Sequence, residues 1–142
     1  MGLPFPDPKE RTPAILVVED EALIRLVVSD YLQECGFKVH GAASAAEAIE
    51  IIESGRAPID LVFSDVGMPG EMDGFGLARW IRQNHPSLPV ILASGDGRKS
   101  EAARELCENE PFFAKPYDVR LVVAQIRSLI EAKAAKGGPG GG

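Results

Sequence analysis

Residues 14–20 read AILVVED, a run of five apolar side chains that ends in two acids. A run this short and this apolar is typical of a β-strand that is buried on both faces of a parallel sheet. Residues 59–63, IDLVF, and residues 90–93, VILA, have nearly the same character. Shorter runs at 38–41 and 111–114 complete a set of five expected strands.

Amphipathic segments separate these runs. Apolar residues recur at helical spacing over 23–35, 44–54, 73–84 and 118–134, and a shorter, weakly apolar helix is expected over 99–108. Strict alternation of strands and helices predicts an α/β fold, with a parallel sheet covered by helices on both faces. Such sheets bind ligands beyond the carboxyl ends of their strands.

The length of 142 residues predicts one compact domain. The prolines and glycines near the ends predict a disordered Pro-rich extension over 1–13, a folded domain over 14–134 and a flexible Gly-rich tail over 135–142. The net charge of -6 disfavours direct binding to nucleic acid or to an anionic membrane. We expect a cytoplasmic protein, because the sequence has only two cysteines, no signal segment and no run that could span a bilayer.

Reactive side chains follow four of the five expected strands. Glu19 and Asp20 follow the first strand, Asp65 follows the third, and Ser94 and Lys115 follow the fourth and fifth. Each has a structural alternative: Asp20 as a helix cap, Asp65 and Ser94 as turn residues, and Lys115 as a solvated cation. Their joint occurrence at one edge of the sheet favours a functional site.

A cluster of acids at this edge predicts a bound cation. Two carboxylates about 4 Å apart repel each other by roughly 4 kcal/mol at an effective dielectric constant near 20. Oxygen ligands with room for water suit Mg²⁺ or Mn²⁺. Cysteine and histidine do not occur at these strand ends, which disfavours zinc.

The chain resembles the receiver domain of two-component response regulators. Four motifs carry this resemblance over residues 14–134: VVEDE at 17–21, FSDVGMPGEMDG at 63–74, LASG at 92–95 and FFAKPY at 112–117. The resemblance implies a flavodoxin-like, five-stranded parallel sheet of order 2-1-3-4-5 flanked by five helices. It also implies a phosphoacceptor signalling protein that catalyses only its own phosphorylation and dephosphorylation. Because the chain ends soon after the last expected helix, we expect no output domain in this chain.

Two groups of roles follow from the resemblance. Asp65 is expected to accept the phosphoryl group from a phosphohistidine. Glu19, Asp20, Asp65 and the backbone carbonyl of Gly67 are expected to hold Mg²⁺ or Mn²⁺. The loop after Asp65 is one residue longer than the commonest family form, which is expected to change the loop tip without moving Gly67.

The remaining roles concern the phosphorylated state. Ser94 and Lys115 are expected to bind the phosphoryl oxygens, and Ser94 with Phe112 to form a conformational switch. Phenylalanine at 112 replaces the frequent tyrosine, so switching is expected to depend on where the ring lies. The bond before Pro116 is expected to be cis.

The expected partners are a sensor histidine kinase or a histidine phosphotransferase, a downstream protein and, on phosphorylation, a second copy of the domain. The downstream contact is expected on the face of the fourth helix, fifth strand and fifth helix. There Leu121, Ala124 and Ser128 form either a contact surface or scattered exposed residues.

Three alternatives remain at this point. The chain could be a receiver taken from a hybrid histidine kinase. A metal-dependent phosphatase of the haloacid dehalogenase type would need an aspartate at the position of Ala22. A flavin carrier would need a phosphate-binding loop after the first strand, where Glu19, Asp20 and Glu21 would repel phosphate.

Overall fold

A computed structural model of the chain describes residues 11–68, 70–94, 112–114 and 118–136. The elements are, in chain order, β1 (Ala14–Val18), α1 (Ala22–Glu34), β2 (Lys38–Ala42), α2 (Ala45–Ser54), β3 (Leu61–Asp65), α3 (Gly74–Asn84), β4 (Val90–Ser94), β5 (Phe112–Ala114) and α5 (Val119–Lys136). The expected helix over 99–108 lies outside the described residues.

All five strands pair in parallel, in the order β2-β1-β3-β4-β5. This confirms the predicted α/β fold and its strand order. β3 differs from the prediction, because it begins at Leu61 and runs on through Ser64 and Asp65. The apolar pattern ends at Phe63, but backbone pairing continues and matches Asp65 with Ala93 of β4. Asp65 therefore belongs to the strand itself.

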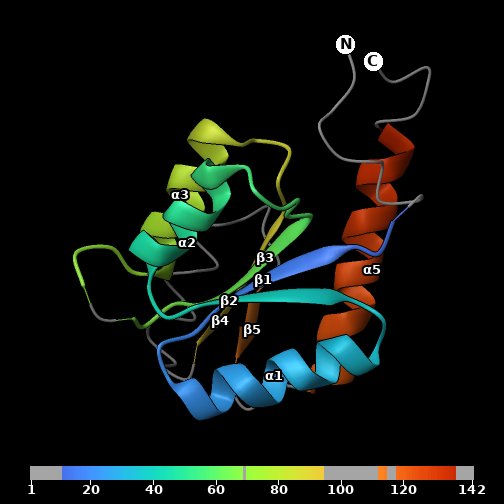
Figure 1. The fold of residues 1–142 in the computed structure, drawn as a ribbon, viewed down its shortest axis with the longest axis horizontal. Helices are drawn as coiled ribbons and strands as arrows, with labels where there is room; N and C mark the ends of the chain where they lie inside the picture. The colour runs from blue at the N-terminus through green and yellow to red at the C-terminus, as the bar shows by residue number, and fades with distance from the viewer. Residues whose placement is uncertain (1–10, 69, 95–111, 115–117, 137–142) are drawn as a thin grey trace.

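The sheet separates two hydrophobic cores. Helices α2 and α3 cover one face of the sheet, and α1 and α5 cover the other (Figure 1). Alternate residues of each strand face opposite cores, as the two-residue period of a strand requires. In β1, Leu16 packs toward α2 and α3, whereas Ile15 and Val17 pack toward α1 and α5.

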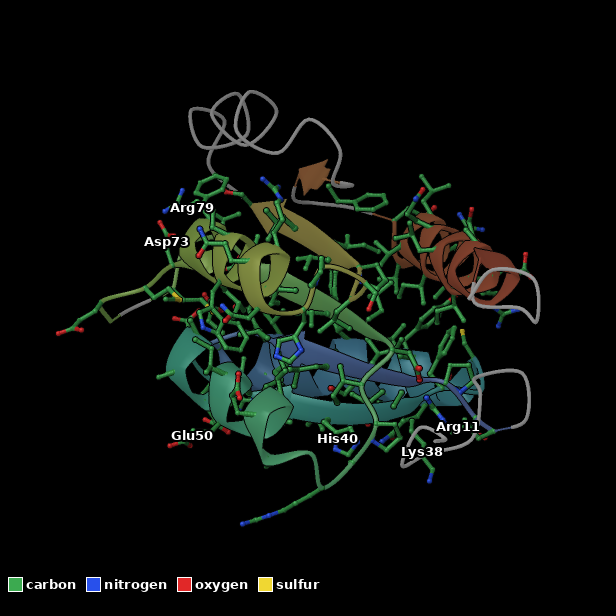
Figure 2. All side chains as sticks on the ribbon, turned by 90° about the horizontal axis from the view of Figure 1, so that it is seen from above. Arg11, Lys38, His40, Glu50, Asp73 and Arg79 are labelled. Atoms are coloured by element: carbon green, nitrogen blue, oxygen red, sulfur yellow. The ribbon has the colours of Figure 1, made fainter. Side chains whose placement is uncertain are left out.

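An ion pair closes the amino edge of the sheet. The Arg11 guanidinium donates to both carboxylate oxygens of Asp60, at 2.6 and 2.7 Å. One of these oxygens also accepts the backbone N–H of Ala14, at 2.7 Å. The Asp60 side chain is only 2% exposed, so this charge is compensated almost entirely within the protein. Figure 2 shows Arg11 and Lys38 at this end of the molecule, and Asp73 and Arg79 of the α3 region at the other.

Candidate functional site

Three carboxylates meet at the carboxyl edge of the sheet. Glu19, Asp20 and Asp65 each contribute one oxygen to a group whose members all lie within 4.8 Å of one another. They meet because β1 and β3 are neighbours, with Val18 paired to Ser64. Glu19 is only 5% exposed, whereas Asp20 remains open to solvent. The predicted clustering of the three acids is thus present in the structure.

Asp20 does not cap the helix that follows it. The N-cap residue of α1 is Glu21, and no side chain there accepts a hydrogen bond from the first turn. By contrast, Ser44 caps α2 and Asp73 caps α3 through side-chain oxygens. The capping alternative for Asp20 is therefore wrong, and its carboxylate is directed to the acidic cluster instead.

The start of α3 fixes the backbone that follows Asp65. The N–H of Val66 donates to the carbonyl of Ala93 at 2.9 Å, and the N–H of Gly74 donates to the carbonyl of Val66, also at 2.9 Å. A Cβ atom on Gly74 would lie 2.7 Å from the Cα of Val66 and would also strike the Asp65 carbonyl. Only glycine allows this contact. The sequence analysis did not predict this contact of Gly74, although an Asp-Gly pair shortly after Asp65 is a signal for a tight backbone approach.

The backbone of Glu19 is also fixed on both sides. Its N–H donates to the carbonyl of Ala42 in β2 at 3.0 Å. Its carbonyl accepts a hydrogen bond from the Arg25 guanidinium of α1 at 2.6 Å. Sequence reasoning missed Arg25 too, because an arginine in an amphipathic helix gives no sign of which carbonyl it reaches.

The clustered residues fit a small, hard cation. An octahedral Mg²⁺ with ligands at about 2.1 Å holds opposite oxygens roughly 4.2 Å apart, close to the spread of these carboxylates. All the donors in the cluster are carboxylate oxygens, the ligands that Mg²⁺ and Mn²⁺ prefer. Phe63 and Ala93, which belong to the core under α1 and α5, line a small pocket that Glu19 and Asp65 border, so the charged groups lie next to apolar residues.

The structure describes only some of the other predicted site residues. Ser94 ends β4, beside the strand that carries Asp65, and is only 3% exposed. Phe112 lies in β5, and its backbone pairs with that of Leu92 in β4. The side chain of Phe112 lies outside the described part of the structure. Lys115 and Pro116 also lie outside the described residues. Gly67 is exposed in the loop after β3.

The predicted contact surface on α5 is exposed. Leu121 is 61% exposed, and Ala124 and Ser128 lie on the same open side of the helix. Their role as a contact surface stays a prediction. None of the helices in the described ranges is both long and apolar enough to cross a membrane.

The fold and site define an α/β protein with a cluster of three carboxylates at the carboxyl edge of a parallel sheet. Residues 15–127 match the family described as the response regulator receiver domain. The chain belongs to this family. It is a receiver domain of the two-component type, a signalling module rather than a conventional enzyme.

Individual relatives support the assignment. The sensor kinase CckA of Brucella abortus is 38% identical over 119 residues, which cover 82% of this chain and 12% of that protein. The signal receiver domain of an HD domain-containing protein from Pseudomonas fluorescens superposes with a TM-score of 0.78 at 28% identity, covering 88% of this chain and 99% of that one.

A third relative was solved with ligands. The response regulator TrrA of Thermotoga maritima, in complex with Mg²⁺ and BeF, gives a TM-score of 0.72 at 27% identity, covering 83% of this chain and 99% of that one. The chain spans only 12% to 50% of the length of the first four curated relatives that it matches.

Proposed function

We propose that this receiver domain accepts a phosphoryl group on Asp65 and thereby changes its affinity for a protein partner. The observation that carries the proposal is the gathering of Glu19, Asp20 and Asp65 within 4.8 Å, with Asp65 as the last residue of the central strand β3. The Mg²⁺ and BeF complex of the related TrrA supports the same assignment, because BeF bound with Mg²⁺ resembles a phosphoryl group.

The proposed step is a transfer between two side chains. A carboxylate oxygen of Asp65 attacks the phosphorus of a phosphohistidine, the P–N bond breaks, and the released imidazole takes up a proton. Asp65 then carries an acyl phosphate. Glu19, Asp20 and the carbonyl of Gly67 are the proposed further ligands of Mg²⁺, which would neutralise charge as the phosphoryl oxygens approach the carboxylate.

Residues at the ends of the neighbouring strands are proposed to respond to phosphorylation. Ser94 is proposed to donate its hydroxyl proton to a phosphoryl oxygen, with Lys115 as counter-charge and Phe112 as the switching ring. The support is the position of Ser94 at the end of β4, one strand away from Asp65. A charge-assisted hydrogen bond of this kind is worth about 1.5 to 3 kcal/mol, enough to shift a conformational equilibrium roughly tenfold to a hundredfold.

The phosphodonor is proposed to dock on α1, next to the acidic cluster. Leu23, Leu26 and Val27 are 72%, 56% and 58% exposed and form an apolar stripe at helical spacing. This stripe begins three residues after Asp20, so a partner helix packed on it would lie beside the phosphoacceptor. A downstream target or a second phosphorylated copy is assigned to the α5 side, around Leu121.

One observation favours a second candidate. The match to CckA covers a small part of a sensor kinase, so the chain is also a candidate for the receiver of a hybrid histidine kinase. Such a receiver would exchange phosphoryl groups with a histidine phosphotransferase. Rates of transfer from purified kinases and phosphotransferases would separate the two candidates by which donor class reacts faster.

The proposed function is tested with acetyl phosphate and intact-protein mass spectrometry. We expect one added phosphoryl group when Mg²⁺ or Mn²⁺ is present and none with a chelator. Asp65→Asn should abolish this addition, whereas Ser94→Ala should still be phosphorylated but show weaker changes in the NMR signals of β5. Full phosphorylation of Asp65→Asn would show that the acceptor is another residue, and an undiminished response of Ser94→Ala would remove Ser94 from the switch.

A further inference from the structure

Arg25 lies in the first turn of α1 and reaches back to the end of β1. Its Nη1 atom donates to the backbone carbonyl oxygen of Glu19 at 2.6 Å, in a partly buried environment. A short hydrogen bond from a charged donor is stronger than one between neutral groups. Arg25 therefore links α1 to the strand end that carries the first two acids of the cluster.

The bonded carbonyl belongs to the peptide unit that joins Glu19 to Asp20. Both residues contribute a carboxylate to the cluster, and a hydrogen bond on this carbonyl restrains the backbone torsions ψ of Glu19 and φ of Asp20 on either side of the peptide. On the other side of Glu19, its N–H is bonded to the carbonyl of Ala42. The backbone at Glu19 is thus held by β2 through one hydrogen bond and by Arg25 through the other.

Gly41 provides the space for this contact. A Cβ atom built on Gly41 would lie 3.3 Å from Cδ, 3.6 Å from Nε and 3.7 Å from Cγ of Arg25. The aliphatic stem of Arg25 therefore crosses β2 directly above a residue without a side chain. Glycine weakens a strand interior, and close approach of another group is a physical reason to find one there.

We propose that Arg25 is a positioning residue for the cation site, and that Gly41, which has no side chain, leaves the space that the Arg25 side chain needs to reach the Glu19 carbonyl. This rests on the proposed function, in which Glu19, Asp20 and Asp65 bind Mg²⁺. Two effects of Arg25 on cation affinity have opposite signs. Its positive charge repels a cation, so removing it would tighten binding, whereas loss of a hydrogen bond that orients the acids would weaken binding. Orientation of the acids is the larger of the two effects.

The test is the dissociation constant for Mn²⁺, measured by electron paramagnetic resonance on wild type, Arg25→Ala, Gly41→Val and the double variant. Partners that orient metal ligands typically contribute a factor of about 10 to 100 in affinity. We expect Arg25→Ala to bind Mn²⁺ about tenfold more weakly. Gly41→Val should also weaken binding, although it leaves every charge in place and adds a side chain that strands favour.

Coupling between the two changes distinguishes positioning from a general loss of structure. Gly41→Val should cause no further loss of affinity when Arg25 is already alanine, because both changes remove the same contact. Arg56→Ala is the charge control. Arg56 is exposed in the connection that leads to the amino end of β3, away from the cluster, and its removal should not weaken Mn²⁺ binding.

An unchanged or tighter Mn²⁺ constant in Arg25→Ala would overturn the proposal, and so would fully additive losses in the double variant. Absence of Mn²⁺ binding by the wild type would instead contradict the proposed function. Wild-type binding that depends on Asp65, with no effect of Arg25 or Gly41, would contradict the positioning role alone.

Discussion

Glu19, Asp20 and Asp65 place three carboxylates within 4.8 Å, where like charges repel one another and a bound cation would relieve the repulsion. The α1 N-cap is Glu21, so Asp20 offers no capping contribution to offset this repulsion. The stability of the domain should therefore depend on divalent cations.

Asp20→Asn should raise the melting temperature of the metal-free domain and reduce the further increase that Mg²⁺ produces. The amide removes one of three repelling charges, and it also removes one oxygen ligand. Differential scanning calorimetry with and without Mg²⁺ would measure both effects. A metal-free variant less stable than the metal-free wild type would show that Asp20 has a structural role outside the cluster.

The acids of the site could be predicted, whereas the residues that hold them could not. Glu19, Asp20 and Asp65 follow short apolar runs, and parallel strands bring such positions together. Arg25 and Gly74 act through contacts with the backbone of other elements. Those contacts depend on how helices approach the sheet, which a single sequence does not specify.

At the scale of elements, periodicity predicted every described helix and strand to within about two residues at each end. The largest difference is in β3, where the prediction followed hydrophobicity and stopped before Ser64 and Asp65. Backbone hydrogen bonds do not require apolar side chains, so pairing with β4 carries the strand two residues further. That extension is what makes Asp65 part of the rigid sheet.

The first turn of α5 contains a local pH-dependent contact. The Arg120 side chain donates to both oxygens of Asp118, at 3.1 and 2.8 Å, and its backbone N–H donates to one of them at 2.9 Å. These side-chain hydrogen bonds, followed by the backbone one, hold the pKa of Asp118 below the ordinary aspartate value. The charged carboxylate is therefore the form that stabilises the start of the helix.

Since the folded pKa of Asp118 is lowered, its stabilising effect is complete above the ordinary aspartate pKa and is lost as the pH falls through the lowered value. NMR titration of the Asp118 carboxyl carbon should show this low pKa. Arg120→Ala should raise it, and high salt should raise it in part because the pair is exposed. An Asp118 pKa that is the same in wild type and Arg120→Ala would show that Arg120 does not bind the carboxylate in solution.

The exposed stripe of α1 gives a prediction about the phosphodonor. Leu26→Glu should slow transfer from a kinase phosphohistidine about tenfold or more, because one apolar contact in an interface centre can carry this much binding energy. Phosphorylation by acetyl phosphate, which needs no docking surface, should be unchanged. Leu121→Glu is the matched control, since Leu121 is similarly exposed, at 61%, but lies on α5.

Equal slowing by Leu26→Glu and Leu121→Glu would place the donor contact on both helices and contradict a docking site confined to α1. Slowing with acetyl phosphate as well would show that Leu26→Glu disturbs the acidic cluster itself. Transfer rates measured at several kinase concentrations would separate weaker docking from slower chemistry.

At the scale of the whole molecule, the two edges of the sheet differ in what they contribute. The carboxyl edge carries the acidic cluster, and the amino edge carries the Arg11–Asp60 pair. The same five strands run from one edge to the other, with one hydrophobic core on each face of the sheet. A change at the amino edge should therefore alter stability without altering the chemistry of the site.

Arg11→Ala should lower the free energy of unfolding by about 2 to 3 kcal/mol, because it leaves the buried Asp60 carboxylate without its charged partner. Urea denaturation followed by circular dichroism would measure this loss. Arg56→Ala, at an exposed arginine, should change stability by less than about 0.5 kcal/mol. A loss below that limit for Arg11→Ala would mean that water replaces Arg11 at no cost.

The closed amino edge has a consequence for how natural variants of this protein would behave in a cell. Substitutions around Arg11 and Asp60 would chiefly change the amount of folded protein, through turnover of the unfolded fraction. Substitutions in the acidic cluster would instead act chiefly on cation binding and on the proposed phosphorylation. A phenotype rescued by overexpression would therefore point to the amino edge.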